Sequence, residues 1–480
     1  MEINNVKGTH DIFGGEASAY SQVEAIMKNI AELFAFMEVR PPVIEHSEVF
    51  VRGVGESSDV VRKEMYTFLD KGNRSLTLRP EFTAGIIRFM VQNKLLITNE
   101  LPLKVYYDGP VFRYERPQLG RYRQFNQFGV EAVGNNSPLC DLEVILLAYT
   151  ILTSLGLENV TIKINNLGDE NSRVAYRQAL RDYFKDLLPK MCPDCQSRYE
   201  LNPLRILDCK VPEDQKLVKD APKLSAYLSE ASKKRFETIT SYLTSLGIPF
   251  ELDDNLVRGL DYYSETVFEF HYTSGKGNDY GAIGGGGRYD KLVKEFGGPE
   301  LSGIGFSFGI ERVVSILRDD EIIPSDIPGV DLAFYVIPVG EKAQFTAHAI
   351  ATNIRLLGYS ADVCFDDIKL AAMFKRADKK GAKYAIIIGE EEINNHKVII
   401  KNLATKEQIE VDQEDFENKI VELMEEHSHD CSCGCHDDHG DCGCECHDDH
   451  EECDCCEGED CDCDCHDGEE CSCGCHEEKK

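Results

Sequence analysis

The pattern of hydrophobic and polar positions between residues 104 and 133 predicts two strands joined by a polar turn. The apolar run from Lys104 to Phe112 forms the first strand, Glu115 to Gly120 the turn, and Tyr122 to Val133 the returning strand. Side chains two residues apart on a strand share a face. One face of the returning strand therefore carries Arg121, Arg123, Phe125, Gln127, Gly129 and Glu131, whereas Asn126, Phe128 and Val130 point the other way.

This face carries both arginines and a glutamate, so it suits a ligand with a phosphate at one end and a cationic or N–H-donating group at the other. Arginine matches phosphate oxygens bidentately, and a glutamate accepts from N–H donors. The alternative is a solvated face of an ordinary sheet, which is where charged strand residues usually lie. The segment alone favours the ligand only modestly.

Helical spacing of apolar residues predicts a helix over Ser18 to Phe36, and an extended segment follows at Glu38 to Ile44. Pro41 and Pro42 suggest an edge strand or a bend there. Residues from about 170 to 250 are mostly helical in pattern, at Asn171 to Leu187 and Leu217 to Leu246. We expect these helices to form an insert between two strand-rich blocks.

The pattern changes after a proline-containing linker, Ile322 to Gly329. Strands and helices then alternate, which predicts a small α/β domain with a mixed sheet. The expected strands are Leu332 to Val336, Ser360 to Phe365, Tyr384 to Ile388 and Val398 to Asn402, and the expected helices are Lys342 to Leu357, Leu370 to Lys380 and Glu414 to Glu426.

Composition bears on the cellular compartment and on how charge is distributed along the chain. The first eleven residues have neither a basic segment nor an apolar one, so no secretory signal is visible and a cytoplasmic location is expected. Five scattered cysteines in a body of more than 400 residues are typical of a reduced compartment. Residues 427–480 hold 20 acidic residues and two lysines, a net charge of −18, which leaves −15 of the total −33 to the body. An acidic body can still bind RNA through local basic patches.

Cys192, Cys195 and Cys209 are three candidate zinc ligands in the insert. A single Cys-x-x-Cys lacks the second pair that makes such a signal strong. A structural or merely local role is therefore favoured.

The tail from residue 427 has no aromatic or aliphatic residue beyond glycine, so it cannot build a hydrophobic core and is expected to be disordered without metal. It repeats Cys-x-Cys-x-Cys-His, and thiolate with imidazole suits Zn²⁺ or Cu(I). The candidate ligands are Cys431, Cys433, Cys435, His436, Cys442, Cys444, Cys446, His447, Cys461, Cys463, Cys465, His466, Cys471, Cys473, Cys475 and His476.

Four further motifs carry candidate chemistry. Leu78 to Ala84 holds Glu81 and Thr83 two residues apart, a pair that fits either an ammonium group or a helix N-terminus. Leu256 to Tyr263 contains Arg258 before Gly-Leu-Asp-Tyr-Tyr. Ala282 to Asp290 predicts a glycine-rich turn from strand to helix, without the ending of a P-loop. Gly303 to Gly309 misses the dinucleotide fingerprint and precedes Ile-Glu-Arg312.

Taken together, these motifs resemble a known family. The run Phe-Arg-Tyr-Glu-Arg-Pro-Gln-x-Gly-Arg-Tyr-Arg-Gln-Phe, residues 112–125, resembles the motif 2 hairpin of class II aminoacyl-tRNA synthetases in the form used by histidyl-tRNA synthetases. Lys7 to Asp11, Glu38 to Ile44, Leu256 to Tyr263 and Gly303 to Arg312 resemble the family's opening segment, motif 1, histidine-specific motif and motif 3. The resemblance covers residues 1 to about 425.

This resemblance implies an α+β catalytic domain at residues 1–325, with an antiparallel class II sheet and a helical insert at about 170–250. It further implies an α/β anticodon-binding domain at 330–426, followed by the tail at 427–480. It also implies a homodimer through motif 1, and tRNA(His), histidine and ATP with Mg²⁺ as partners and substrates.

The resemblance also implies roles for individual residues. Arg113 and Arg258 would be catalytic. ATP would be bound by Arg113, Glu115, Arg121 and Arg312. Histidine would be bound by Glu81, Thr83, Gln127, Glu131, Arg258, Tyr262, Tyr263 and Tyr289. No side-chain nucleophile is required, because the histidine carboxylate attacks the α-phosphorus of ATP itself. The alternative within this fold is a catalytically silent regulatory subunit of histidine biosynthesis, and such paralogues typically lack the C-terminal domain.

Overall fold

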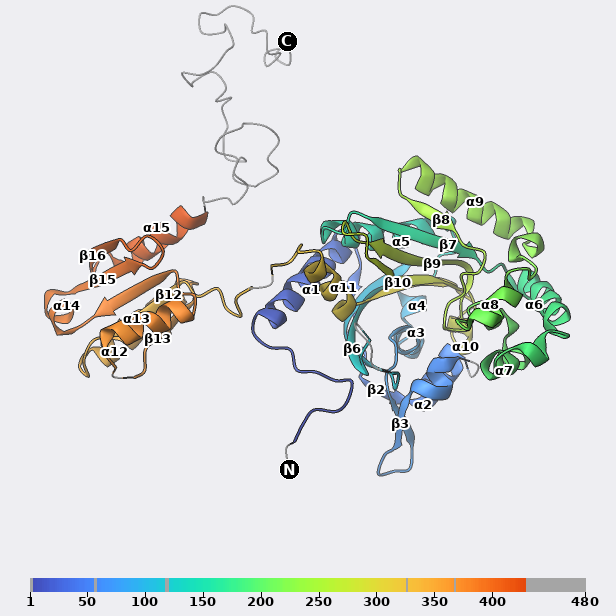
Figure 1. Cartoon of the computed structure of the whole chain (residues 1–480), viewed down its shortest axis with the longest axis horizontal. Coiled ribbons are helices and arrows are strands. Elements are labelled where there is room, and N and C mark those ends of the chain that lie inside the picture. The colour runs from blue at the N-terminus through green and yellow to red at the C-terminus, as the bar shows by residue number, and fades with distance from the viewer. Residues whose placement is uncertain (1–2, 56–57, 117–120, 325–326, 367, 429–480) are drawn as a thin grey trace, which may run out of the picture. The chain divides into compact units, whose positions relative to one another are not determined.

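The computed structural model describes residues 3–55, 58–116, 121–324, 327–366 and 368–428. The chain divides into two compact units, Met1–Val330 and Asp331–Lys480 (Figure 1). The predicted ligands of the tail, from Cys431 to His476, lie outside the described residues. Within the described ranges, no helix is both long and apolar enough to cross a membrane.

The first unit is built on an eight-stranded sheet whose order is β1-β5-β6-β11-β10-β9-β7-β8. All neighbours are antiparallel except the edge pairs β1–β5 and β7–β8. The strands are β1 (Met37–Glu38), β5 (Leu103–Phe112), β6 (Gln124–Val133), β7 (Val160–Asn166), β8 (Phe250–Leu252), β9 (Ser264–Thr273), β10 (Asp279–Tyr289) and β11 (Gly303–Gly309). A small second sheet joins β2 (Ile44–His46), β4 (Ser75–Leu78) and β3 (Tyr66–Leu69).

The predicted hairpin is confirmed. β5 and β6 pair antiparallel along their whole length, from Leu103 opposite Val133 to Phe112 opposite Gln124. The predicted alternation also holds, because Phe128 and Val130 enter the main hydrophobic core while Gln127 and Glu131 face a cavity. Part of the predicted turn, residues 117–120, lies outside the described residues.

Helices pack on both faces of the large sheet. α1 (Gly15–Leu33), α5 (Pro138–Ser154) and α11 (Ile310–Asp319) cover the face that holds Phe128 and Val130 (Figure 1). Nine of the 17 residues of α5 are buried, so this helix fills the centre of the core. On the opposite face, α3 (Thr83–Gln92) and α10 (Leu292–Glu295) pack beside β5, and α2 (Ser47–Val54) and α4 (Leu95–Thr98) lie against α3. The insert packs on Val267 of β9 on the same face, and the cavity opens between these two groups of helices.

The insert between β7 and β8 is helical, as predicted, but it is divided differently. Leu217 to Leu246 does not form one helix: α8 (Pro212–Val218) ends, and α9 (Glu230–Ser245) starts afresh after a 3-10 turn at Leu224–Tyr227. Pro222 interrupts the helical pattern, and the Ser229 side chain caps α9 by accepting from the backbone N–H of Ser232 at 3.2 Å. The other helices are α6 (Glu170–Phe184) and α7 (Pro193–Leu201), with 3-10 turns at Leu188–Lys190 and Pro203–Ile206.

The predicted glycine-rich turn at Ala282 to Asp290 is wrong. Ala282 to Tyr289 belong to β10, which lies between β9 and β11 in the middle of the sheet. A Cβ on Gly286 would lie only 1.9 Å from the carbonyl oxygen of Gly305 on the neighbouring strand. The glycines therefore serve close packing of strands and not a change of direction.

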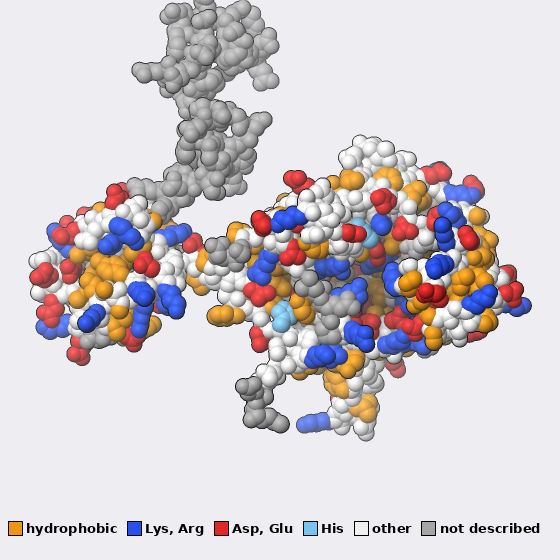
Figure 2. Space-filling model, viewed as in Figure 1, with side chains coloured by type: hydrophobic (Ala, Val, Ile, Leu, Met, Phe, Trp, Pro, Cys, Tyr) orange, Lys and Arg blue, Asp and Glu red, His pale blue; other side chains and the backbone are white. Residues whose placement is uncertain are grey.

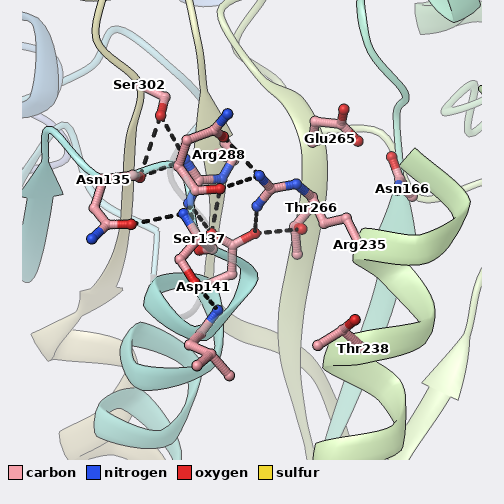
Figure 3. Close-up of polar contacts among 12 residues, drawn as sticks. Asn135, Ser137, Asp141, Asn166, Arg235, Thr238, Glu265, Thr266, Arg288 and Ser302 are labelled. Atoms are coloured by element: carbon pink, nitrogen blue, oxygen red, sulfur yellow. Dashed lines mark hydrogen bonds and ion pairs between the residues drawn. The ribbon is translucent and has the colours of Figure 1, made fainter. Parts of the chain in front are cut away.

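A buried ion pair fastens the insert and the core helix to β10 (Figure 3). Arg288 is fully buried, and its guanidinium donates to Asp141 of α5, to the carbonyl of Asn135 and to Ser302. Arg235 of α9 donates to the other carboxylate oxygen of Asp141 at 3.1 Å. The contacts link three elements that are far apart in the sequence.

The second unit is an α/β domain with a mixed sheet, as predicted. Its order is β13-β12-β14-β15-β16, with β12, β13 and β14 parallel and β15 and β16 antiparallel. The strands are β12 (Phe334–Pro338), β13 (Ala361–Val363), β14 (Tyr384–Ile388), β15 (Lys397–Asn402) and β16 (Gln408–Asp412). The helices are α12 (Ala343–Leu356), α13 (Leu370–Lys379), α14 (Glu390–Asn395) and α15 (Phe416–Ser428). The short elements α14 and β16 are absent from the sequence prediction.

Candidate functional site

A cavity of about 420 Å³ opens on the sheet of the first unit. Figure 2 shows this hollow, with Lys, Arg, Asp and Glu side chains around it. All twelve body residues predicted from the sequence line it: Glu81, Thr83, Arg113, Glu115, Arg121, Gln127, Glu131, Arg258, Tyr262, Tyr263, Tyr289 and Arg312. They come from five separate parts of the first unit, so the fold brings together what the sequence separates.

The acidic end of the cavity is built around Glu131. Thr83 donates to one carboxylate oxygen at 2.5 Å, and the Tyr289 hydroxyl donates to the other at 2.7 Å. Beside them Glu81 accepts from the backbone N–H groups of Thr83 at 2.6 Å and Ala84 at 3.0 Å. Glu81 therefore caps the N-terminus of α3, so the predicted helix start and the predicted ligand position coincide.

Burial sets the protonation of this end. Burial raises the pKa of Glu131 to about 8, although hydrogen bonds from Thr83 and Tyr289 lower it, and the charge of Glu81 raises it further. Burial also raises the pKa of Glu81, against the backbone N–H donors of Ala84 and Thr83. Two buried carboxyls with raised pKa values favour a cationic or strongly donating ligand, although the charge of Arg113 lowers the pKa of Glu81.

Bare glycines make room for these side chains. A Cβ on Gly305 of β11 would lie 2.1 Å from Oε2 of Glu131, and one on Gly287 would lie 2.8 Å from the Tyr263 ring. The floor of the cavity is therefore backbone, and the functional side chains lie directly on it.

Arg258 lines the same cavity. Its Nη1 donates to Glu269 of β9 at 2.5 Å, and a Cβ on Gly285 would lie 2.8 Å from the same nitrogen. Burial lowers the pKa of Arg258 and the charge of Glu269 raises it, with a net rise. Burial raises the pKa of Glu269, but a hydrogen bond with His271 and the charge of Arg258 bring it down to about 2. The pair therefore stays charged, and Arg258 is both an ion-pair arginine and a lining residue.

Three further arginines form a cationic end. Arg113 donates from Nε to the carbonyl of Pro80 at 2.8 Å, and its guanidinium lies 5.4 Å from the centre of the Phe125 ring. Arg312 of α11 donates to the carbonyl of Tyr280. Its pKa is lowered by burial and then by the charge of Arg121, so these two cations face the same space. Like charges held together in a cavity favour a bound anion.

Glu115 and the remaining polar groups complete the lining. Glu115 lies 3.7 Å from Arg121 as a weak ion pair. Gln127 is buried, and the rings of Tyr262 and Tyr263 contact each other at a tilt of 57°, with ring centres 4.6 Å apart. Tyr262 also meets the Tyr289 ring edge to face at 5.7 Å. The aromatic wall leads from the acidic end to Arg258.

The sequence analysis assigned no role to several lining residues, among them Glu269 and Glu311. Glu269, which forms the ion pair with Arg258, lies 11 residues after it in the sequence. Glu311 accepts from the backbone N–H of Asn126 at 2.8 and 3.0 Å, and burial raises its pKa to about 7. Its position next to Arg312 was the available signal. Asn126 thus contributes its backbone and not its side chain to the site's frame.

Two family models match the chain. Residues 8–313 match "Histidyl-tRNA synthetase", and residues 333–423 match "Anticodon binding domain". Neither model reaches the tail.

The match to curated relatives covers nearly the whole length of those relatives. The chain is 46% identical over 419 residues to "Histidine--tRNA ligase" of Bacillus licheniformis, which is 87% of this chain and 98% of that protein. It is 47% identical over 408 residues to the protein of that name from a Geobacillus species, 84% of this chain and 95% of that protein.

Solved structures agree. Apo histidyl-tRNA synthetase of S. aureus has a TM-score of 0.74 and 35% identity, covering 87% of this chain and all of that one. A Bacillus halodurans protein described as an ATP phosphoribosyltransferase regulatory subunit/histidyl-tRNA synthetase shares the fold, with a TM-score of 0.58 at 19% identity. The matched models, the identity over nearly complete relatives and the fold together place this chain in the histidyl-tRNA synthetase family.

Proposed function

We propose that this protein is a histidine–tRNA ligase, which activates histidine with ATP and transfers it to tRNA(His). The observation that carries the proposal is the polarity of one cavity. Two buried carboxyls, Glu81 and Glu131, line the same cavity as four arginines, Arg113, Arg121, Arg258 and Arg312. This arrangement suits a cationic amino acid beside a nucleoside triphosphate.

The acidic end would hold histidine. Glu81, Thr83 and Gln127 would accept from its ammonium group, while Glu131 and Tyr263 would contact its imidazole. Tyr262 and Tyr289 would form the walls around the ring. A buried carboxyl left without a donor is costly, so amino acids whose side chains cannot donate would be rejected.

The arginine end would hold ATP. Arg121 and Arg312 would bind the nucleotide tail, and Glu115 would contact the nucleotide. The histidine carboxylate would attack the α-phosphorus in line, forming a C–O–P linkage as pyrophosphate leaves. Arg113 and Arg258 would stabilise the charge that develops on the phosphoryl oxygens. The 3′-terminal ribose hydroxyl of tRNA would then attack the carbonyl carbon, and AMP would leave.

Mg²⁺ is expected to enter with ATP. Among the described residues, the carboxylates of Glu115 and Glu64 line the cavity and are the oxygen donors that this ion prefers. When bound, the ion would neutralise phosphate charge. The arginines of this chain would orient the reacting groups.

Two larger partners belong to the same proposal. The second unit, which matches the anticodon-binding family, would contact tRNA. A homodimer would form through motif 1, where Val43 and Ile44 leave 36% and 49% of their surface exposed.

Histidine-dependent ATP/pyrophosphate exchange tests the proposal. The full chain should exchange label only with histidine present. Arg258→Ala should lower kcat about 10²- to 10³-fold, the loss typical of a donor that stabilises transition-state charge. Arg376→Ala, in the second unit and paired with Asp366, is the matched control, since amino-acid activation needs no tRNA.

Absence of exchange in both the full chain and a chain truncated after residue 428 would instead support a regulatory subunit. Exchange by both chains would support the ligase and would leave the tail without a role in activation.

The sequence of the tail supports a second, independent proposal, that it binds soft metal ions. With 15 cysteines and eight histidines, at four ligands an ion, its capacity would be about four or five zinc ions. Native mass spectrometry with added zinc should show these ions. If the chain truncated after residue 428 binds as many zinc ions as the full chain, the proposal is contradicted.

A further inference from the structure

Three cysteines and an aspartate of the insert converge on one point. Cys192 caps α7, Cys195 lies in its first turn, Cys209 follows the 3-10 turn at Pro203–Ile206, and Asp214 lies in the first turn of α8. One side-chain donor atom from each of these residues lies within 4.8 Å of all the others. Among the described residues no other His, Cys, Asp and Glu side chains gather in this way.

We propose that this cluster binds one structural Zn²⁺ through Cys192, Cys195, Cys209 and Asp214. The sequence alone offered three ligands and no second pair. The structure supplies the fourth donor, which comes from a different helix five residues after Cys209.

The distances match one tetrahedral ion. Two thiolates bound to zinc at 2.3 Å with tetrahedral angles lie about 3.8 Å apart, and a thiolate and a carboxylate oxygen about 3.5 Å apart. Sγ of Cys192 and Sγ of Cys209 are 3.9 Å apart, and Sγ of Cys209 is 3.3 Å from Oδ2 of Asp214. The cysteines are free thiols and form no disulfide.

Burial makes an empty cluster costly. Cys195 is 0% exposed, Cys209 4% and Asp214 1%, and the buried carboxylate lies among three sulfur atoms with the backbone N–H of Cys192 and the thiol of Cys209 as its donors. A cation would satisfy all four groups at once. Three sulfurs with one oxygen suit Zn²⁺ better than Mg²⁺ or Ca²⁺, which prefer oxygen alone.

The surroundings have the hydrogen bonds and charge that such a site needs. The backbone N–H of Cys192 donates to both oxygens of Asp214, at 3.2 and 3.1 Å, and that of Cys195 donates to Sγ of Cys192 at 3.4 Å. Arg198 interacts electrostatically with Cys195 and Cys209. The guanidinium of Arg198 would offset part of the negative charge that four ionised ligands leave around a divalent metal ion.

The site would fasten the insert to the catalytic cavity. Arg198 donates to the carbonyl of Arg205 at 3.1 Å and to Asp59 at 3.1 Å. Arg205, on the turn between the two ligand-bearing segments, donates to the carbonyl of Gly259, which follows Arg258. The ion would therefore hold the turn that fixes the Arg258 loop, without contacting a substrate itself.

Zinc counting on the full chain tests the proposal. After saturation with Zn²⁺ and removal of the excess, native mass spectrometry should find one ion fewer in Asp214→Asn and in Cys195→Ser than in the parent. Cys364→Ser, a buried cysteine of the second unit, should keep the full count. Counts equal in all four proteins would overturn the proposal.

Peptide-resolved alkylation separates this site from the tail and needs no variant. Cys192, which is partly exposed, should resist N-ethylmaleimide in the zinc-loaded chain and react after chelation. Equal labelling with and without zinc, or a Cys192–Cys209 disulfide in the unreduced digest, would overturn the assignment even if the variants fail to fold.

Discussion

The hydroxyl of Thr83 donates to Oε1 of Glu131 at 2.5 Å, although the two residues lie 48 positions apart. Thr83 begins α3 and Glu131 lies on β6. The contact therefore joins the cap of one helix to the ligand face of the central hairpin, and it makes the acidic end of the cavity a single hydrogen-bonded unit.

Glu131 should make the stability of the protein depend on pH. Its pKa is about 8 in the folded chain and near 4.5 when unfolded. The folded state therefore holds an extra proton between these values, and stability falls as pH rises from about 4.5 to 8, by up to about 1.4 kcal/mol per pH unit. Glu131→Gln removes this titration. Calorimetry should show that the melting temperature of the variant rises relative to that of the parent as pH increases. A difference in melting temperature that does not change with pH would contradict the assignment.

The bare floor of the cavity should not tolerate a methyl group beneath Glu131. Gly305→Ala places a Cβ 2.1 Å from Oε2 of Glu131 and 2.4 Å from the carbonyl of Val130. We expect a loss of about 1–3 kcal/mol in the free energy of unfolding and a raised KM for histidine. Gly275→Ala, where no atom lies within 4 Å, is the control. Equal effects of both variants in urea titration and exchange would contradict this reading.

Arg312 should matter for ATP and not for histidine. Hydrogen bonds to charged groups contribute about 1.5–3 kcal/mol, so Arg312→Ala should raise the KM for ATP about 10- to 100-fold. Arg318→Ala, on the same helix and paired with Glu16, should leave both KM values unchanged. Exchange kinetics with each substrate varied in turn measures this. A matching rise in the KM for histidine would show that Arg312 acts through the shape of the cavity.

Asp141 should be among the most sensitive positions for stability. Asp141→Asn leaves Arg288, which is fully buried, without its charged partner and weakens the contact with Arg235 (Figure 3). Breaking a buried pair on one side typically costs about 3–5 kcal/mol. The exposed pair of Lys397 with Glu410 offers the comparison, and Lys397→Met should not shift the unfolding midpoint. A small loss for Asp141→Asn in urea titration would mean that Arg288 finds another partner.

The twelve predicted residues that line the cavity were assigned from short motifs that resemble the histidyl-tRNA synthetase family, and periodicity supports only those on β6. Alternation on β6 is enough to put Gln127 and Glu131 on one face, since the strand period is two whatever the neighbours are. The second unit is predicted nearly as well, because its strands and helices are separate and strongly patterned. The short α14 and β16 carry too few apolar residues to be seen.

Contacts between distant segments are what the sequence cannot give. The glycine run of β10 has no strand propensity, and only the closeness of β9 and β11 explains it. Asp214 was one acidic residue among many until the fold placed it beside the cysteines. The break before α9 is a different case, because Pro222 and the Ser229 cap are local signals for the turn at Leu224–Tyr227.

The two faces of β6 have a consequence for how activity responds to damage. Phe128 and Val130 lie in the main core, so a slip of one residue would turn them outward and carry Gln127 and Glu131 into the core. A chain in the wrong register therefore cannot hold the core together and cannot bind substrate either. Substitutions that weaken the core around β6 should then reduce the number of active molecules while leaving the turnover of each surviving molecule intact.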